Sequence, residues 1–363
     1  ILINIFSFLF IITILVVIHE LGHFLAAKSI GLKVEKFYIG FNLFGLGLKK
    51  KIKETEYGIG LFPLGGYVKV AGILDESMDS NIEYKEYEFR SKNTFEKIWF
   101  LSAGVLMNFI LSTIIFSAFT FFNGIPEIVD KPIIKDVIEK INEDGDISPA
   151  FLAKIQSGDE IISINEIDIN SWSNLSEIIH NNPEKYINVK WKRDNHYYEK
   201  SILTSSTTIF ENGEFNEIGI LGISPDYTIL NAGFFEAIIN GSKQTFSWIK
   251  LMLSSLKALI SGNVSFDQMS GPLGIANVAG EAAQNGGFLA LLMLMAIISV
   301  NLGIINILPI PGLDGGHVFI ALIEGVIQRE LPLNVKYGIQ TFGFFLLMSL
   351  FVLVFYNDII NLI

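Results

Sequence analysis

The residues best suited to metal binding and catalysis are two histidines and a glutamate in the run His19-Glu20-Leu21-Gly22-His23. Residues four apart lie on one face of an α-helix, so both imidazoles could hold the same cation. Glu20 lies beside them, where its carboxylate could accept a proton from a water molecule on that cation. The spacing is the H-E-x-x-H pattern, which predicts a metal-dependent hydrolytic site.

The helix that must carry this run is almost entirely apolar. Residues 1–18 are interrupted only by Asn4, Ser7 and Thr13, and residues 24–27 continue the apolar pattern. The motif therefore lies within a predicted membrane span, where ionisable side chains are costly and usually functional. Two packing histidines beside a snorkelling glutamate are the alternative, but three ionisable groups within five positions call for a compensating ligand.

The composition predicts a membrane protein with several spans. Half of the 363 residues are hydrophobic, and the mean hydropathy is +0.47. The chain contains no cysteine, so any metal must be held by histidine and carboxylate. Further spans are predicted over residues 99–122, 289–308 and 338–354. We expect residues 1–18 to be retained, because cleavage as a signal peptide would discard the metal motif.

The distribution of charge predicts an orientation. Residues 28–98 carry 12 Lys and Arg against 10 Asp and Glu, whereas residues 123–288 carry 12 against 22. By the positive-inside rule, the first of these stretches is cytoplasmic, and the acidic one lies outside. Both ends of the given chain are then also outside.

Residues 234–261 are apolar enough to resemble a fifth span, but polar residues recur along them three and four positions apart. They are Asn240, Lys243, Ser247, Lys250, Ser254, Lys257 and Ser261. Such a stripe predicts an amphipathic helix that lies on the membrane or on another part of the protein. A fifth span is the alternative.

Residues 33–71 predict β-structure rather than a helix. Two apolar arms, 41–48 and 57–70, flank a polar turn at 49–56 and contain repeated glycines. Apolar hairpin arms beside a membrane-embedded site suggest a sheet that dips into the bilayer, with an edge that could pair with an extended substrate. An ordinary cytoplasmic hairpin is the alternative.

A second polar cluster lies at the end of the third predicted span. Pro309 and Pro311 must end that helix, and Asp314 precedes a new helical pattern at 318–327. The first and third spans cross in the same direction if 234–261 does not span, so Asp314 lies at the depth of the two histidines. Two histidines and one carboxylate leave a fourth position for water, as in catalytic zinc sites. Asp314 could instead be the N-cap of the following helix.

The acidic middle of the chain predicts a small soluble module. Residues 126–205 alternate short strands with one helix at 174–180. His180 and His196 lack metal-ligand spacing and are expected on its surface. Asn108, within the second span, either bonds a neighbouring helix or helps to shape the site.

Together these motifs resemble the site-2 protease family of intramembrane zinc proteases, of the bacterial regulator of sigma-E protease type, over nearly the whole chain. His19 to His23 match its H-E-x-x-H motif. Leu313-Asp314-Gly315 match its L-D-G motif, which makes Asp314 the third ligand of Zn²⁺. Residues 62–68 are similar to the segment after the family's membrane-associated hairpin.

The same resemblance implies substrate-binding residues. Gly58-Ile59-Gly60 is similar to a G-x-G motif on an edge strand that holds substrate, and Asn306 matches a position linked to substrate handling. We add Pro309 and Pro311 as substrate-binding candidates.

The middle module is similar to a circularly permuted PDZ domain. Two departures are a single PDZ-like module, where enterobacterial relatives have two, and Val105 in place of a proline in the motif A-G-P-x-x-N-F.

We therefore predict a polytopic α-helical membrane protein with four transmembrane helices, a membrane-associated β-hairpin or sheet, and one extracytoplasmic PDZ-like domain. The predicted parts are a first span with H-E-x-x-H (1–28), a cytoplasmic-side loop with the hairpin (29–98), a second span (99–123), the PDZ-like domain and its extension (124–224), an amphipathic interfacial helix and loop (225–287), a third span with L-D-G (288–316), a cytoplasmic-side helix (317–337) and a fourth span (338–363).

The resemblance implies a zinc peptidase that cleaves within the membrane spans of single-span proteins, such as anti-sigma factors or leftover signal peptides. The expected location is the bacterial cytoplasmic (inner) membrane, with the active site toward the cytoplasm. The lipid bilayer is an expected partner, and nucleic acid is not. The PDZ-like domain would bind substrate C-termini or exclude bulky substrates. Alternatives are a non-catalytic scaffold with a structural metal and a zinc transporter; the open fourth ligand position argues against the scaffold.

Overall fold

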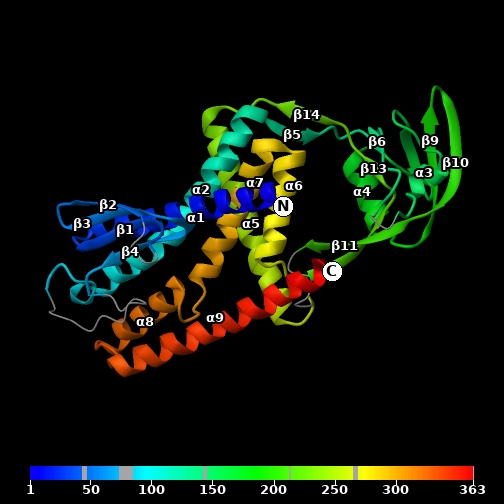
Figure 1. The fold of residues 1–363 in the computed structure, drawn as a ribbon. Coiled ribbons are helices and arrows are strands. Elements are labelled where there is room, and N and C mark those ends of the chain that lie inside the picture. The colour runs from blue at the N-terminus through cyan, green and yellow to red at the C-terminus, as the bar shows by residue number, and fades with distance from the viewer. Residues whose placement is uncertain (43–46, 73–84, 142–144, 212–213, 265–268, 363) are drawn as a thin grey trace. The chain divides into compact units, whose positions relative to one another are not determined.

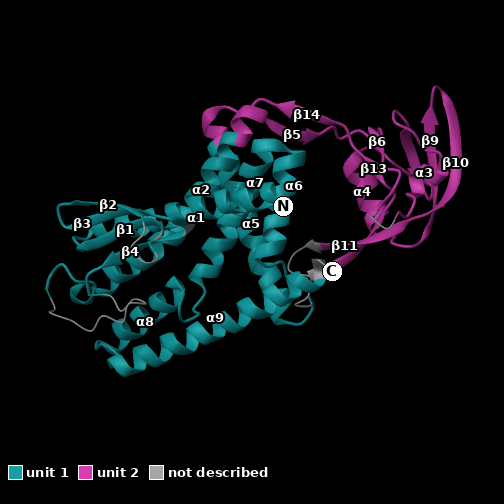
Figure 2. Cartoon of the chain, viewed as in Figure 1, with its two compact units in different colours: residues 1–118, 238–363 teal, residues 119–237 magenta. Residues whose placement is uncertain are grey.

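The computed structural model describes residues 1–42, 47–72, 85–141, 145–211, 214–264 and 269–362. The chain forms two compact units, which are considered separately (Figures 1 and 2). Unit 1 comprises residues 1–118 and 238–363, and unit 2 comprises residues 119–237.

Four helices among the described residues are long and apolar enough to cross a membrane. They are α1 (Leu2–Ser29), α2 (Thr94–Asn123), α7 (Gly287–Ile307) and α9 (Leu333–Leu362). These helices correspond to the four predicted spans but extend past their apolar centres. At the start of α2, for example, Asn93 and Glu96 each bond the other's backbone N–H, at 3.0 and 2.9 Å, and so begin the helix before the apolar run.

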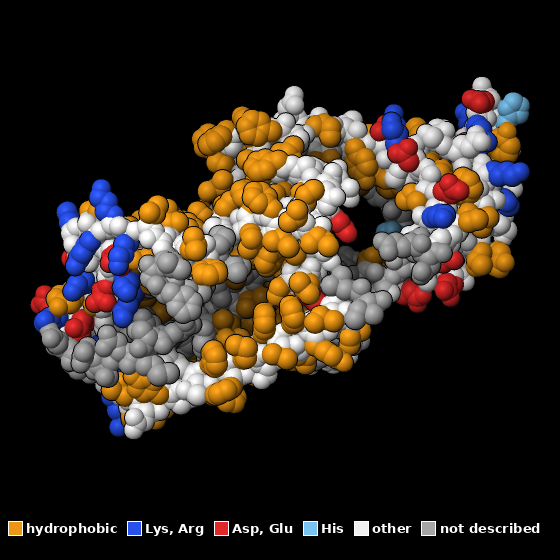
Figure 3. Space-filling model, viewed as in Figure 1, with side chains coloured by type: hydrophobic (Ala, Val, Ile, Leu, Met, Phe, Trp, Pro, Cys, Tyr) orange, Lys and Arg blue, Asp and Glu red, His pale blue; other side chains and the backbone are white. Residues whose placement is uncertain are grey.

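Much of the helical surface of unit 1 is hydrophobic. Figure 3 shows hydrophobic side chains spread over its helices, whereas Lys and Arg gather over the strands near residue 50. On α9 the side chains of Phe342, Phe345 and Val352 are all at least 60% exposed. An apolar surface of this extent is expected of helices that face lipid, and it supports the prediction of a membrane protein.

Two of the remaining helices bear on the predictions. The amphipathic segment forms α5 (Phe234–Ile260), which is not among the candidate spans of the described residues. The sequence did not predict α6 (Pro272–Asn285), a helix rich in glycine and alanine. It packs on α1 so closely that a Cβ at Gly280 would lie 2.0 Å from Oδ1 of Asn4. Small residues serve this contact, and they leave no apolar period to recognise.

The end of α9 is tied to the start of α6 by one carboxylate. Asp358 is 4% exposed and accepts backbone N–H bonds from Gly271, Leu273 and Gly274 at 2.7, 2.9 and 3.2 Å. These N–H groups have no partner within their own helix, so a side chain from another helix caps it.

Replacing Asp358 with alanine should therefore destabilise unit 1. We expect a loss of about 2–4 kcal/mol, because one buried and two part-buried N–H donors lose a charged acceptor. Asp358→Asn retains one acceptor oxygen and should lose roughly half as much. Unfolding curves of the purified protein in detergent measure both, with Tyr356→Phe as a control at an exposed neighbouring position. An alanine variant as stable as the control would contradict this capping role.

The predicted hairpin is part of a four-stranded sheet. Its strands are β1 (Val34–Phe41), β2 (Gly47–Ile52), β3 (Thr55–Gly60) and β4 (Phe62–Val70), in the order β2-β3-β1-β4. Strands β2 and β3 are antiparallel, β3 and β1 are parallel, and β1 and β4 are antiparallel. The predicted polar turn at 49–56 is too long, because β2 and β3 pair as far as Ile52 and Thr55. All residues of β2 are exposed, so its lysines resembled a turn.

The prediction that Gly58-Ile59-Gly60 lies on an edge strand is wrong for this sheet. Within β3, Gly58 pairs with Lys49 of β2 on one side and with Tyr38 of β1 on the other. Among the described strands, β2 and β4 form the two edges. The order of strands depends on long-range pairing, which the local glycine pattern does not specify.

Gly58 has a packing role instead. The ring of Tyr38 stacks on Tyr67 with centroids 5.2 Å apart, and a Cβ at Gly58 would lie only 2.1 Å from the Tyr38 ring. The Tyr38 hydroxyl donates to Glu56 at 2.5 Å. Burial and this bond raise the pKa of Tyr38 to about 12. Glycine at position 58 therefore leaves space for the Tyr38 side chain, which links β1 to β3 and β4.

Unit 2 is a β-rich module with its own core. Its main sheet has the order β10-β9-β7-β8. Its elements are β5 (Ile125–Ile128), β6 (Asp136–Val137), α3 (Pro149–Ala153), β7 (Glu160–Ile164), β8 (Ile167–Asp168), α4 (Trp172–His180), β9 (Tyr186–Arg193), β10 (His196–Leu203), β11 (Ser205–Glu211), β12 (Glu214–Ile220), β13 (Ile223–Ser224) and β14 (Tyr227–Leu230). His180 and His196 are exposed, as predicted.

The core of unit 2 extends beyond the predicted module end at residue 205. Leu221 is 2% exposed and packs with Ile161, Leu175 and Val189 in the same cluster. The fully buried Asp159 pairs with Arg193 through two bonds of 2.6 and 2.7 Å, and this pairing raises the pKa of the Arg193 guanidinium. Because Leu221 belongs to this core, the strands after residue 205 are part of the module.

Candidate metal centre

The structure brings the three predicted metal ligands together, although they come from α1 and from α8 (Asp314–Ile327). Oδ2 of Asp314 lies 3.0 Å from Nε2 of His19 and 3.3 Å from Nε2 of His23, and the two Nε2 atoms are 3.2 Å apart. Ligand atoms that surround one zinc ion tetrahedrally at about 2.0 Å lie roughly 3.3 Å from one another. The three donors are thus spaced as a zinc ion requires.

The outer nitrogens of both rings determine which form the histidines take. Nδ1 of His23 lies 2.9 Å from the carbonyl oxygen of Phe100, which can only accept, so the proton is on Nδ1 and Nε2 keeps its lone pair. Nδ1 of His19 lies 3.2 Å from the side-chain nitrogen of Asn108, whose Oδ1 is buried without a hydrogen-bond partner among the described residues. Turning the Asn108 amide by 180° lets Oδ1 accept from His19 Nδ1–H, which leaves the lone pair on Nε2.

With those tautomers, two nitrogen lone pairs and a carboxylate oxygen converge on one point in a buried place. His19 and His23 are 7% and 6% exposed, and Oδ2 of Asp314 has no hydrogen-bond partner among the described residues. Such a cluster of electron pairs is stable only around a cation. A metal ion therefore fits the donors better than the packing-histidine alternative.

Helix α2 provides the space for this cluster. A Cβ on Gly104 would lie 2.4 Å from Nε2 of His23 and 2.7 Å from Nε2 of His19. Phe100, Gly104 and Asn108 are spaced four apart, so they form one stripe on the face of α2 toward the histidines. The motifs in the sequence assign no role to Gly104. A glycine four residues before an asparagine in an apolar span was the available signal.

The glycine inside the H-E-x-x-H motif allows α1 and α2 to approach each other. A Cβ on Gly22 would lie 2.4 Å from the carbonyl oxygen of Ala103. Because Gly22 lies between the two histidines, this close contact places the turn of α1 that carries them against Phe100, Gly104 and Asn108 on α2. The ligands and the space for them are thereby brought to the same level.

The connection from α7 to α8 positions the Asp314 carboxylate beside the two histidines. The N-cap of α8 is Leu313, without a side-chain cap bond, and Asp314 is the first helical residue, so the N-cap alternative for Asp314 is wrong. A Cβ on Gly315 would lie 2.2 Å from the carbonyl oxygens of Ile307 and Leu308. The glycine after Asp314 therefore lets the end of α7 fold over the start of α8.

The predicted substrate-binding residues lie in two places. Asn306 is half-buried in the last turn of α7, and Pro309 and Pro311 lie in the α7–α8 connection that leads to Asp314. Strand β3, with Gly58-Ile59-Gly60, is separated from β4 by β1.

Strand β4 is the one beside Glu20. A Cβ on Gly66 would lie 3.7 Å from Cγ of Glu20, and the backbone N–H of Val68 is directed at the Glu20 carboxylate. Of the sheet's two described edges, this is the one adjacent to the motif.

Asn108 should be a positioning residue for His19. Replacing it with leucine removes the acceptor for His19 Nδ1–H, so we expect zinc affinity to fall about 10- to 100-fold. Asn108→Asp keeps an acceptor oxygen and should retain most of the affinity. Competition with a chromophoric chelator measures the dissociation constants. Equal affinities for the leucine and aspartate variants would show that the bond to His19 does not matter.

A buried His-His-Asp group with a neighbouring glutamate, whose histidines lie on a long apolar helix, defines a metal-dependent hydrolase of the membrane. Comparison with known proteins places the chain within that class. Residues 7–350 match the model of peptidase family M50. The chain belongs to this family, which confirms its resemblance to the site-2 proteases.

Similar proteins cover almost the same length. The chain is 33% identical to a protein of Clostridium acetobutylicum over 347 residues, which are 96% of this chain and 94% of the relative. It is 33% identical to a protein of Rickettsia conorii over 379 residues, with 99% of each chain covered. Both carry the provisional name zinc metalloprotease. The zinc metalloprotease RasP of Geobacillus kaustophilus is 29% identical over 432 residues, or 98% and 97% of the chains.

These relatives and the geometry agree on the class of enzyme. The predicted metalloprotease assignment is confirmed by the family and by the names of the relatives. Zinc is the cofactor in those names, and it suits the nitrogen and oxygen donors of His19, His23 and Asp314. The prediction of a multi-pass membrane protein is likewise supported by the family and by the four apolar helices among the described residues.

Proposed function

We propose that this chain hydrolyses peptide bonds within the membrane-spanning segments of single-span proteins. The observation that carries the proposal is the position of the donors: His19 and His23 lie near the end of a long apolar helix, with Asp314 beside them. A site on such helices suits a substrate that is itself in the membrane.

In this proposal Glu20 is the general base. Zinc, when bound by His19, His23 and Asp314, supplies Lewis acidity for the scissile carbonyl and acidifies a water molecule. Glu20 accepts the proton of the attacking water and later donates it to the leaving amine. Asn108 and the carbonyl of Phe100 keep both imidazoles in the tautomer that presents Nε2.

Strand β4 is the proposed docking strand for the substrate backbone. A helical substrate hides its peptide bonds in internal hydrogen bonds, so it must unwind before attack. Pairing near Gly66 with the outer edge of β4, which no described strand occupies, would replace those bonds directly beside Glu20. Asn306, Pro309 and Pro311 are further proposed contacts of the substrate. They lie at the end of α7 and in the connection that leads to Asp314. Both sides of β3 are paired, so Gly58-Ile59-Gly60 is not proposed to add a substrate strand.

Unit 2 is proposed to act as a PDZ-like domain that controls access. A groove of about 230 Å³ lies between α4 and residues 219–223, and its lining includes Ile138, Leu175 and Ile179. An apolar groove beside a helix suits an extended peptide, which supports capture of a substrate end. Exclusion of substrates with bulky outer domains is the second proposed role.

The proposed setting is regulated proteolysis in the bacterial cytoplasmic membrane. Anti-sigma factors and leftover signal peptides are the proposed substrates, with the active site toward the cytoplasm and unit 2 outside. The cluster of exposed lysines on β2 supports this orientation through the positive-inside rule. A scaffold with a structural metal is the alternative, and the three-donor group argues against it because structural zinc usually has four protein ligands.

Chelator-sensitive cleavage of a model membrane peptide tests the proposal. We expect the full chain in lipid nanodiscs to cut a single-span peptide within its apolar segment, to stop when zinc is removed, and to recover when zinc returns. A soluble peptide of the same cleavage sequence is the control for the membrane requirement. Retention of zinc without cleavage of any single-span peptide would favour the scaffold.

A further inference from the structure

A small cavity in unit 1 has a lining rich in positive charge. It lies between η2 (Phe89–Ser91), α2, α8 and α9, and its volume is about 50 Å³. One water molecule needs roughly 10–15 Å³ of such space, so the cavity could hold a group the size of about three to five waters. A tetrahedral oxyanion such as phosphate is of this size.

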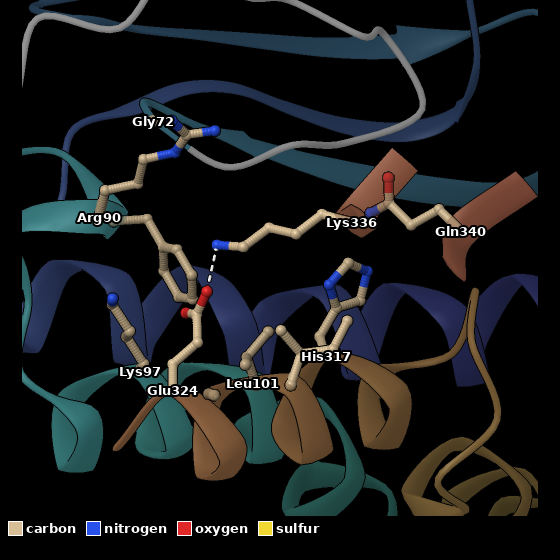
Figure 4. A pocket seen from close by; sticks show the side chains of 11 residues that line it. Gly72, Arg90, Lys97, Leu101, His317, Glu324, Lys336 and Gln340 are labelled. Atoms are coloured by element: carbon tan, nitrogen blue, oxygen red, sulfur yellow. Dashed lines mark ion pairs between the residues drawn. The ribbon is translucent and has the colours of Figure 1, made fainter. Parts of the chain in front are cut away.

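Among the described residues that line the cavity, cations outnumber carboxylates. Arg90, Lys97 and Lys336 line it, and Glu324 is the lining carboxylate (Figure 4). Glu324 is already engaged, because its Oε1 accepts from Lys336 Nζ at 2.6 Å and from the backbone N–H of Leu331 at 2.8 Å. Lys336 is thus neutralised, and the other two cations are not.

Arg90 and Lys97 are buried cations in need of a counter-ion. They are 8% and 9% exposed, and no ion pair joins either one to a carboxylate within the described ranges. Lys97 Nζ lies 5.7 Å from the centre of the ring of Phe89, which also lines the cavity. Glu88 is a nearby buried carboxylate that does not line the cavity, and its Oε2 has no hydrogen-bond partner among the described residues. Even when Glu88 is counted, the three described cations outnumber the two described carboxylates. Buried charges without partners are costly, so an anion is the missing component.

The position of the cavity indicates where that anion comes from. Lys97 lies in the first turn of α2, and Lys336 lies in the first turn of α9, and both helices are candidate spans. The ends of membrane spans lie at the level of lipid headgroups. The amino-terminal ends of helices also carry partial positive charge, which favours phosphate.

We propose that this cavity binds a phosphate group through Arg90 and Lys97, either from a membrane lipid headgroup or as free phosphate. The bound group holds η2 and α2 to α8 and α9. His317, one turn beyond Asp314 on α8, lines the opposite side of the cavity, so the site adjoins the helix of the third metal ligand.

Thermal unfolding of the purified full chain in a non-ionic detergent tests the proposal. One arm adds sodium phosphate against sodium chloride of equal ionic strength, and the other adds dihexanoyl phosphatidylglycerol against dihexanoyl glycerol. We expect a rise of about 5 °C at saturation in at least one arm. A rise with the phospholipid alone identifies a headgroup as the source, and a rise with both identifies a general phosphate site. No rise in either arm overturns the proposal.

Matched variants assign the effect to the cavity. The double variant Arg90→Gln, Lys97→Gln should need at least tenfold more phosphate or phospholipid for half of the shift. Lys49→Gln with Lys51→Gln removes the same charge from the exposed strand β2 and should keep the full shift at the original concentration. Lys97→Met keeps the stem over Phe89 and serves if the double variant does not fold. An unchanged midpoint in Lys97→Met, or in the double variant, overturns the proposal.

Discussion

Replacing Glu20 with glutamine should abolish peptide cleavage while the protein keeps its metal. The three donor atoms of His19, His23 and Asp314 converge without any contribution from Glu20. Glutamine fills the same space beside Gly66 but cannot accept the proton of the attacking water. General base catalysis contributes about 10²- to 10⁴-fold to a rate, so we expect a loss of that order. Cleavage of a single-span peptide and the zinc content per chain are measured on the same sample.

A carboxylate remote from the ligands provides the control. Glu54 lies in the turn between β2 and β3 and pairs with Lys28 at 2.9 Å, which holds the pKa of the Glu54 carboxyl below its usual range. Glu54→Gln makes the same chemical change and should leave cleavage and zinc content as they are. Normal cleavage by Glu20→Gln would refute its role as the base. A loss of zinc in Glu20→Gln would instead show that Glu20 supports the metal group.

The grouping of the three candidate metal ligands could be predicted because their signals are local or depend on simple topology. His19 and His23 are four apart on one helix, which fixes their common face. Asp314 follows two prolines that must end a span, and the direction of the spans places it at the same depth as the histidines. Neither step requires knowledge of how side chains pack.

The features that the sequence did not reveal depend on contacts between distant elements. The order of strands places β4 beside Glu20 and puts Gly58 inside the sheet, and this order is a property of long-range pairing. Helix α6 is recognisable only from its partners, since Gly280 meets Asn4 and a distant carboxylate, Asp358, caps its first turn. Local sequence patterns identify residues that could bind a metal or take part in catalysis. The packing of distant elements determines which of these residues come into contact.

The packing of Gly104 leaves space that the candidate ligands His19 and His23 occupy, and its replacement should weaken metal binding. A Cβ there would lie 2.4 Å from Nε2 of His23 and 2.7 Å from Nε2 of His19, well inside van der Waals contact. The imidazoles would have to move away from each other and from Asp314. Overpacking of this kind costs about 1–3 kcal/mol, which corresponds to a loss of zinc affinity of about 10- to 100-fold for Gly104→Ala. We expect Gly104→Val to lose more, with cleavage lost in parallel.

Two comparisons make this result specific to the centre. Gly338→Ala adds the same methyl group to α9, where nothing lies within 4 Å of the new atom, and should leave zinc affinity unchanged. Asp314→Ala removes a donor and sets the scale for losing a ligand. If Gly104→Ala binds zinc as tightly as the unaltered chain, the histidines can rearrange freely, and the pre-formed centre inferred here is wrong. If its affinity instead falls toward that of Asp314→Ala while the fold is retained, a residue with no ligand atom controls the metal by the space that it leaves empty.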